Sequence, residues 1–373
     1  MPDSLRRRVR AALAAVAYLN TDPDVFPRAS GIHLGNPNMP IQKFLLPYVA
    51  NLIPDHPMAP KWMEASEQFV RYKMQLLSAP KGGWGEMIHY FNASVPHLGR
   101  MILALENSFQ ADPRTIRQFA MIPRFAASFM TPPDPRFGAR ILPGLGHCGV
   151  HVDCYALPTA VMVKERDPEL AGELLWAWRA GGGLMHGFGE YRRLLPLFTE
   201  IPTPAVPEKL LRSQWYPGVG AVLRAHPGSP DETYLLYSQG YFLSHRDSDQ
   251  GEFVLYAKGA PLSPLPMRGY VTQQTSPHND WGGSQGLYQT RCDIYNRVRL
   301  GAPDETGGWP GGGLESNVNE FYGGETLDYL CGWGDRGGTP GKRCGASGAR
   351  IWTRQGRIQG FRGLGRGSVR PDL

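Results

Sequence analysis

Residues 240–262 read Gly-Tyr-Phe-Leu-Ser-His-Arg-Asp-Ser-Asp-Gln-Gly-Glu-Phe-Val-Leu-Tyr-Ala-Lys-Gly-Ala-Pro-Leu. In this stretch His245, Asp247 and Asp249 alternate with other residues, and the apolar run 253–257 follows closely. Alternate residues of an extended strand point to the same face, so these three polar side chains converge on one side. The pattern is typical of a general base beside carboxylates that bind a metal or orient the base.

The length and composition predict a folded, ligand-handling protein. With 373 residues the chain is long enough for two domains with ordinary cores. An aromatic content of 11%, with nine Trp, argues against a disordered chain. Because no apolar run approaches the roughly 18 residues that a membrane helix needs, we expect no membrane span.

The net charge of +6 comes from the C-terminal end of the chain. Residues 331–373 hold nine Lys and Arg against two Asp, a net charge of +7, so residues 1–330 carry −1. The body of the protein is therefore close to neutral. Its basic isoelectric point gives no reason to expect a nucleic-acid partner.

The cysteines are too few and too scattered to indicate a disulfide framework. Cys148 and Cys154 flank His151 and Asp153, which raises the alternative of a metal site. Their spacing is longer than the short Cys-x-x-Cys of zinc sites, so a buried thiol is the favoured interpretation.

The N-terminus is basic over residues 1–10 and apolar over residues 11–19, as in a signal peptide. The apolar stretch is short and has no clear cleavage site. An amphipathic helix is therefore the favoured interpretation, and export stays open.

Up to about residue 199 the pattern is helical. Apolar residues recur at spacings of three and four over 62–77, 95–107 and 156–164. Asp167 followed by Pro168 predicts the start of a further helix that runs to residue 180. Helices joined by Gly- and Pro-rich loops predict a helical toroid or bundle over residues 1–199.

After a Pro-rich linker at 200–208, the pattern changes to short strands. Runs rich in β-branched and aromatic residues at 220–224, 233–238, 253–258 and 286–289 are separated by Gly, Pro and Asp turns. We therefore expect an antiparallel sheet domain over residues 209–330. The fold class is α+β.

The last 43 residues, 331–373, contain twelve Gly and nine basic residues with little apolar periodicity. Such a segment buries too little apolar surface to offset chain entropy, which predicts a disordered tail. A second interpretation is that this segment is sequence read past the point where the real domain was interrupted. A third is that the Arg/Gly segment binds RNA.

With both halves considered, the chain resembles the heparinase II/III family of polysaccharide lyases. The resemblance covers about residues 30–330, and the best matching stretch joins 221–225, 230–237 and the His245 segment. Residues 276–280 (Ser-Pro-His-Asn-Asp) and 83–90 (Gly-Trp-Gly-Glu-Met-Ile-His-Tyr) resemble two further family segments. The resemblance implies a partial (α/α) toroid followed by an antiparallel β-sandwich.

Three departures from the family pattern stand out. Asp247 replaces the second His of the family motif, and Met267 stands where the family has a carboxylate. These changes weaken the case for a structural zinc held by Asp247 and His278, and we expect no cofactor. The helical half is also short, which suggests a fragment or a shortened barrel with apolar helix faces left uncovered.

The resemblance implies a β-elimination that cleaves a uronic-acid glycan. In this interpretation His245 removes the C5 proton, and Asn36 or Asn38 neutralises the substrate carboxylate. Glu86 and Tyr90, four residues apart, share a helix face and point into one cleft. The remaining candidates for substrate contact are His33, Trp84 and His278.

The proton donor is the weakest part of this interpretation. Phe129 stands where a family Tyr is expected before a Pro-Asp-x-x-Gly turn, and residues 133–138 of this chain read Pro-Asp-Pro-Arg-Phe-Gly. Tyr155 is the alternative donor, and ordinary structural roles remain open for every candidate. A relative that binds an acidic polysaccharide without cleaving it, or a truncated lyase, is the competing prediction. If the resemblance holds, the protein is periplasmic or secreted.

Overall fold

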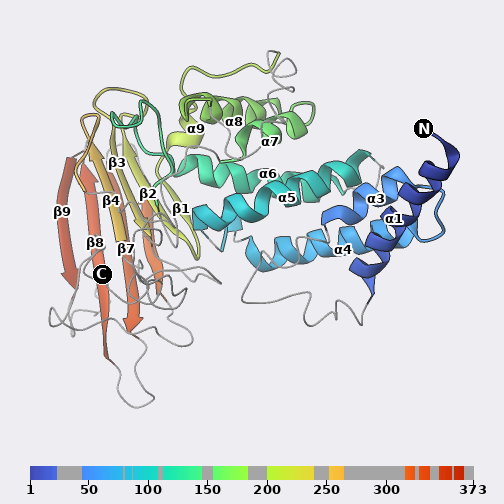
Figure 1. Cartoon of the computed structure of the whole chain (residues 1–373). Helices are drawn as coiled ribbons and strands as arrows, with labels where there is room; N and C mark the ends of the chain where they lie inside the picture. Colours follow the sequence, from blue (N-terminus) through green and yellow to red (C-terminus); the bar gives the residue numbers. More distant parts are fainter. Residues whose placement is uncertain are drawn as a thin grey trace, which may run out of the picture.

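The computed structural model describes residues 1–22, 44–78, 80–85, 87–107, 112–144, 154–183, 200–238, 252–263, 316–323, 327–336, 344–354 and 357–364. Within these ranges the chain is a mixed α+β protein, with helices in the first half and antiparallel sheets in the second. Figure 1 shows the helices as an elongated stack with the sheets at one end. The N-terminus lies at the opposite end.

The helical half is built from long amphipathic helices. Asp112 and Asp167 cap α6 and α8 by accepting hydrogen bonds from backbone N–H groups, and each is followed by a Pro at the first helical position. Large apolar side chains such as Trp62, Phe91 and Phe119 are fully buried between the helices. The elements are α1 (Asp3–Thr21), α3 (Leu46–Leu52), α4 (Ala59–Leu77), the 3-10 turn η2 (Pro80–Gly82), α5 (Met87–Asn107), α6 (Pro113–Ser128), α7 (Ala156–Val163), α8 (Pro168–Ala180) and α9 (Glu208–Leu211).

These helices confirm the periodicity over 62–77, 95–107, 156–164 and 167–180. The helix α1 agrees with the amphipathic interpretation of the N-terminal residues. In the described part of the chain, no helix is long and apolar enough to cross a membrane. Closure of the helices into a toroid remains a prediction.

The sheet half holds two antiparallel sheets in which strands that are consecutive in sequence are neighbours. The first contains β1 (Gln214–Tyr216), β2 (Gly220–Ala225), β3 (Thr233–Ser238), β4 (Glu252–Ala257) and β5 (Ala260–Pro261). The second contains β6 (Ser316–Gly323), β7 (Leu327–Arg336), β8 (Cys344–Arg354) and β9 (Arg357–Leu364). Three predicted strands are confirmed as β2, β3 and β4, whereas 286–289 lies outside the described residues.

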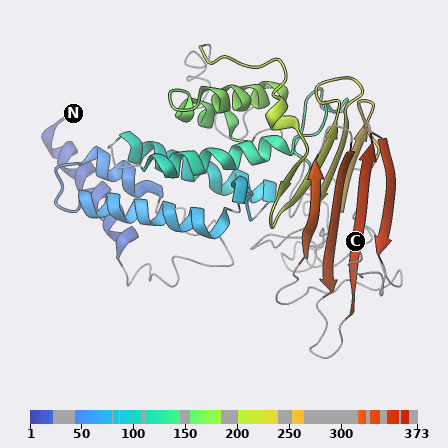
Figure 2. The same cartoon turned by 180° about the vertical axis from the view of Figure 1, so that it is seen from behind.

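The first sheet is a middle layer that is buried on both faces. Along β3, Tyr234 and Leu236 belong to the core shared with the helices, whereas Leu235 and Tyr237 belong to a second apolar cluster with Leu330 of β7. This alternation follows from the two-residue period of a strand. It explains why β2 and β3 are almost continuously apolar. Figure 2 shows the same order of layers from behind.

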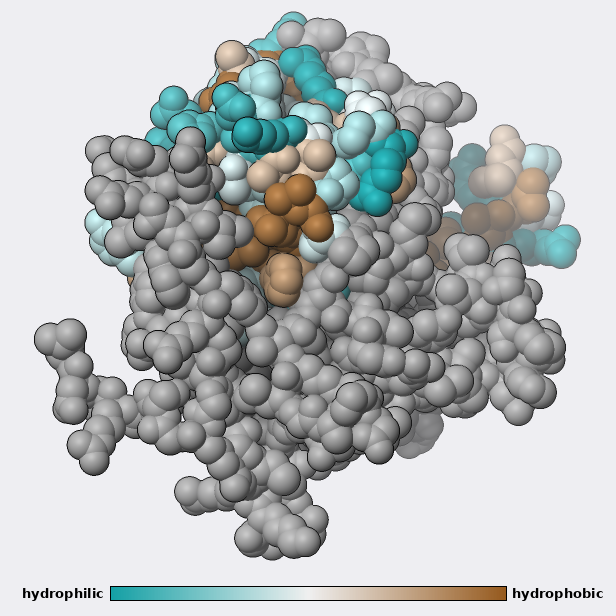
Figure 3. Space-filling model, turned by 90° about the vertical axis from the view of Figure 1, so that its left-hand side faces the viewer, coloured by the Kyte–Doolittle hydropathy of each residue, from teal (hydrophilic) through white to brown (hydrophobic). Residues whose placement is uncertain are grey.

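The prediction that residues 331–373 form a disordered tail is wrong for the part of this segment that the structure describes. Residues 344–354 and 357–364 form β8 and β9, and β7 extends to Arg336. These segments have few apolar side chains, but a strand in a ladder satisfies its backbone groups through its neighbours. Figure 3 views the molecule from the sheet end and shows an apolar area with hydrophilic described side chains above and beside it.

Candidate functional site

The helical half meets the first sheet at the C-terminal end of α6 and along residues 129–142. Tyr216 of β1 packs edge-on against Phe125 and Phe129, with ring centroids 4.9 and 5.5 Å apart. From β3, Tyr234 Oη donates a hydrogen bond of 2.7 Å to the Phe129 carbonyl. All four side chains are buried, so the junction continues the core of the helical half.

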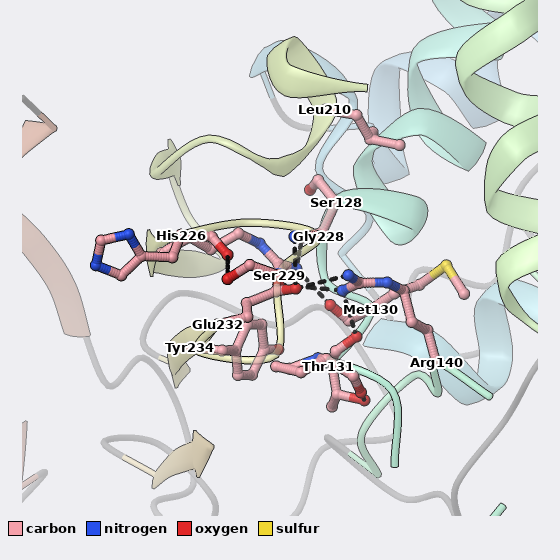
Figure 4. Close-up of polar contacts among 12 residues, drawn as sticks. Ser128, Met130, Thr131, Arg140, Leu210, His226, Gly228, Ser229, Glu232 and Tyr234 are labelled. Carbon is pink, nitrogen blue, oxygen red and sulfur yellow. Dashed lines mark hydrogen bonds and ion pairs between the residues drawn. The ribbon is translucent and has the colours of Figure 1, made fainter. Parts of the chain in front are cut away.

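Two arginines share one carboxylate inside this junction (Figure 4). Arg140 Nη2 lies 2.6 Å from Glu232 Oε2, and Arg224 Nη1 lies 2.8 Å from Glu232 Oε1. The Gly228 N–H donates to Oε2 at 2.9 Å, and Arg224 Nη2 donates to the Ser128 carbonyl at 2.9 Å. This buried cluster joins residue 140 of the helical half to β2 and to the turn before β3.

The charges of the cluster are mutually stabilised. Burial alone would raise the pKa of Glu232, but the hydrogen bond from Arg140 and the charge of Arg224 outweigh it and hold the pKa below its ordinary value. Burial lowers the pKa of Arg224, and the carboxylate of Glu232 opposes that effect. Because all three side chains are buried, this geometry serves to hold the two halves together and offers a ligand no access.

A second polar anchor holds the turn at residues 133–138 against β4. Tyr256 Oη donates a hydrogen bond of 2.6 Å to Asp134 Oδ2, and Arg136 donates to both carboxylate oxygens. Burial would raise the pKa of Asp134, but these hydrogen bonds lower it below its ordinary value. Phe129, which stands where a proton-donating Tyr was expected, is fully buried before this turn.

The described residues attach two candidate segments to the same end of the first sheet. Lys81 Nζ, three residues before Trp84, donates to the Trp215 carbonyl of β1 at 3.3 Å. The next residue along β1, Tyr216, pairs with Gly220, which in turn pairs with Ser238.

Ser238 also pairs with Glu252 of β4, so the two described residues that flank 239–251 lie on this same rung of the sheet. That segment carries His245 and Asp247. Tyr216 and Ser238 are separated by two strand spacings, a distance of about 10 Å across the sheet. The described residues next to the Trp84 segment and next to the His245 segment therefore lie at the same end of the first sheet.

Three predicted site residues fall within described elements. Trp84 is fully buried, so its indole presents no open face to a sugar, and its Nε1 has no hydrogen-bond partner among the described residues. Tyr155 is also buried, and its Oη donates to the Pro96 carbonyl at 3.3 Å. This placement gives Tyr155 a packing role and no support as a proton donor. Tyr90 lies in the first turn of α5.

The other predicted site residues lie outside the described residues. They are His33, Asn36, Asn38, Glu86, His245, Asp247 and His278. Their roles as base, carboxylate clamp, substrate contacts or zinc ligands stay predictions. Among the residues that the structure describes, no group of His, Cys, Asp and Glu could hold a metal ion.

Sequence reasoning missed the Arg140, Glu232 and Arg224 cluster. One signal was present, because Arg224 interrupts an apolar strand at a position whose face is buried. A charged residue at such a position requires a partner. The partner could not be identified from the sequence, because residues 140 and 232 are far apart along the chain.

Comparison with known proteins gives a structural relationship. No family model and no curated protein sequence matches the chain. The crystal structure of heparinase III matches with a TM-score of 0.59 at 15% identity, over 87% of this chain and 46% of that one. The heparan sulfate lyase HepC from Pedobacter heparinus matches with a TM-score of 0.57 at 12% identity, over 94% and 48%.

A heparinase III gene product also matches, with a TM-score of 0.51 at 14% identity, over 84% of this chain and 43% of that one. This chain shares its fold with heparinase III. At these identities the likeness shows the fold alone. The chain spans less than half the length of each of these lyases.

Proposed function

We propose that the protein is a polysaccharide lyase that cleaves a uronic-acid-containing glycan by β-elimination. The observation that carries the proposal is the fold shared with heparinase III and HepC. The attachment of the Trp84 and His245 segments to one end of the first sheet supports it further. In this proposal the helices belong to an (α/α) toroid and the two sheets form a β-sandwich.

The proposed reaction accounts for every proton and bond that changes. His245 takes the C5 proton, the C5–H electrons form the C4–C5 double bond, and the C4–O bond breaks. The departing oxygen receives a proton, for which Tyr90 on α5 is the proposed donor. Asn36 or Asn38 binds the substrate carboxylate, so that negative charge can develop on it in the transition state.

The remaining candidates have supporting roles in this proposal. His33, Glu86 and His278 bind and orient the sugar, and Asp247 orients the base. The reaction requires no activated water and no cofactor. The substrate is an acidic polysaccharide, and the protein acts in the periplasm or outside the cell.

A specific observation favours a second function, the binding of a glycan without cleavage. Phe129 is a core residue, and the Oη of Tyr155 is bonded to a backbone carbonyl inside the helical half. Neither residue can deliver a proton to a sugar in this arrangement. If Tyr90 is not the donor, the protein binds an acidic glycan and leaves it intact.

An assay on a panel of uronate polysaccharides separates the two functions. A lyase generates ultraviolet absorbance from an unsaturated uronide when it is mixed with heparan sulfate, alginate or a related acidic glycan. Isothermal titration with the same glycans reports binding independently. Binding with flat absorbance would assign the second function, and neither signal with any glycan would reject both.

A further inference from the structure

The outer face of α1 carries a continuous apolar stripe that faces solvent. Leu5, Val9, Ala12, Val16 and Leu19 recur at alternating spacings of four and three, which places them on one side of the helix. All five are exposed, and Leu5 and Leu19 keep 45% and 54% of their surface in contact with solvent. The opposite side of α1 faces the core through Leu13, Ala14 and Ala17.

Exposed apolar side chains are concentrated at this end of the molecule. Nine of the twelve large apolar side chains that are exposed among the described residues lie in residues 1–19 or on the neighbouring α3. Those on α3 and at its N-cap are Leu45, Tyr48 and Leu52. Figures 1 and 2 show this end farthest from the sheets. Monomeric proteins rarely expose contiguous apolar surface of this kind, which marks interaction sites.

We propose that α1 pairs with α1 of a second copy of this chain, in antiparallel orientation. The alternating three- and four-residue spacing is that of a helix that packs lengthwise on another helix. Val9 and Val16 hold one set of stripe positions and Leu5, Ala12 and Leu19 the other, so an antiparallel copy brings Leu opposite Leu, Val opposite Val and Ala opposite Ala. A stripe that matches its own copy can close a symmetric dimer, in which the same patch of both subunits forms the interface.

The charges of α1 set the orientation. Arg6, Arg7 and Arg8 lie in its first two turns, whereas its last turn carries no basic residue and is followed by Asp22. A parallel pair would place the two arginine groups side by side. An antiparallel pair places each group beside the partner's carbonyl end, where the helix dipole and Asp22 are negative.

The size of the stripe predicts a weak dimer. Its five positions span about 21 Å along the helix axis. Together with the exposed side chains of α3, it offers roughly 400 Å² of apolar surface per copy, if a large side chain contributes about 100 Å² when fully exposed. The total is below the roughly 1,200 Å² of stable complexes, so association should depend on concentration in the micromolar range.

Sedimentation equilibrium of the full chain over a wide concentration range tests the proposal. We expect a monomer–dimer equilibrium in the wild-type protein. The double variant Val9→Glu, Val16→Glu should raise the dissociation constant at least tenfold, whereas Ala11→Glu, on an exposed position outside the stripe, should leave it unchanged. Far-ultraviolet circular dichroism establishes that each variant keeps its helical content.

Spin labels on Ser4→Cys report the orientation, with the wild-type protein labelled in parallel as background. In an antiparallel pair the two labelled positions lie at opposite ends, about 24 Å apart along the axis, and in a parallel pair they are adjacent. A wild-type monomer at every concentration would overturn the proposal, as would a dimer that the double variant leaves intact. A monomer that binds anionic phosphatidylglycerol vesicles through Val9 and Val16 would assign the stripe to a membrane surface instead.

Discussion

Arg140 and Glu232 form a buried ion pair, with Nη2 and Oε2 2.6 Å apart, that joins the helical half of the chain to the first sheet. The partners lie 92 residues apart in sequence, and Arg224 of β2 completes the cluster from the other side of the carboxylate. This cluster sets the position of the first sheet against the C-terminal end of α6 and the residues that follow it. The ion pair holds the sheet at the start of β3, and Ser238, next to the His245 segment, lies at the other end of that strand.

Glu232→Gln should destabilise the fold strongly. The amide keeps the shape of the side chain but leaves two buried guanidinium groups without their counter-charge, which costs about 3–5 kcal/mol when a buried pair is broken. Urea unfolding measures the change in the free energy of unfolding. The matched control is Glu165→Gln, at a side chain that is 83% exposed, which should change stability by less than about 0.5 kcal/mol. Equal effects of the two variants would contradict the role of the cluster.

We expect the free energy of unfolding to fall at acid pH. The pKa values of Glu232 and Asp134 are lowered in the folded state relative to their ordinary values of 4.5 and 3.8. Each carboxylate therefore stabilises the fold fully above its ordinary pKa, and that contribution is lost as the pH falls through the lowered value.

Urea unfolding at a series of pH values between about 7 and 3 measures this dependence. We expect the free energy of unfolding to decline once the pH drops below about 4.5. Glu232→Gln should flatten this decline, because the variant no longer takes up a proton there. If the free energy of unfolding declined equally steeply with falling pH in the variant, Glu232 would not contribute to this decline.

Gly82→Ala should destabilise the turn that leads into the Trp84 segment. Gly82 has φ +87°, and a Cβ added there would lie 2.1 Å from the carbonyl oxygen of Met121 in α6. Gly138 provides the control, since its φ is +63° and an added Cβ meets nothing within 4 Å.

Gly138→Ala should therefore cost only the backbone strain, about 1–2 kcal/mol. Gly82→Ala adds the displacement of α6 to that strain, a further 1–3 kcal/mol or so. Thermal unfolding of both variants measures the difference. Similar losses in the two would mean that the turn can move away from Met121.

The sequence predicts regular elements best where periodicity and end signals agree. Asp167 and Pro168 located the start of α8, and runs rich in β-branched and aromatic residues between turns located β2 and β3. The helix α6 was missed, and it contains Pro123 in its interior. The strands β8 and β9 were missed because glycine and arginine interrupt their apolar residues, whereas their ladders depend on backbone pairing.

The candidate site was harder to predict than the fold. The buried placements of Trp84 and Tyr155 depend on contacts between helices that are distant in sequence, such as Tyr155 with the carbonyl of Pro96. The spacing of residues along one segment could not show that other parts of the chain cover these two side chains. The Arg140 and Glu232 pair illustrates the same limit, since neither residue identifies its partner.

In the proposed function, His245 acts as the base of a lyase. The decisive measurement is the rate at which unsaturated uronide forms on an acidic glycan that the wild-type protein cleaves, compared between His245→Ala and His226→Asn. The second variant removes an exposed imidazole in the turn between β2 and β3, with φ +52°, a conformation that Asn tolerates. We predict that His245→Ala loses at least about 100-fold in rate, as expected when a general base is removed, while His226→Asn keeps the wild-type rate. A wild-type rate in His245→Ala would contradict the claim.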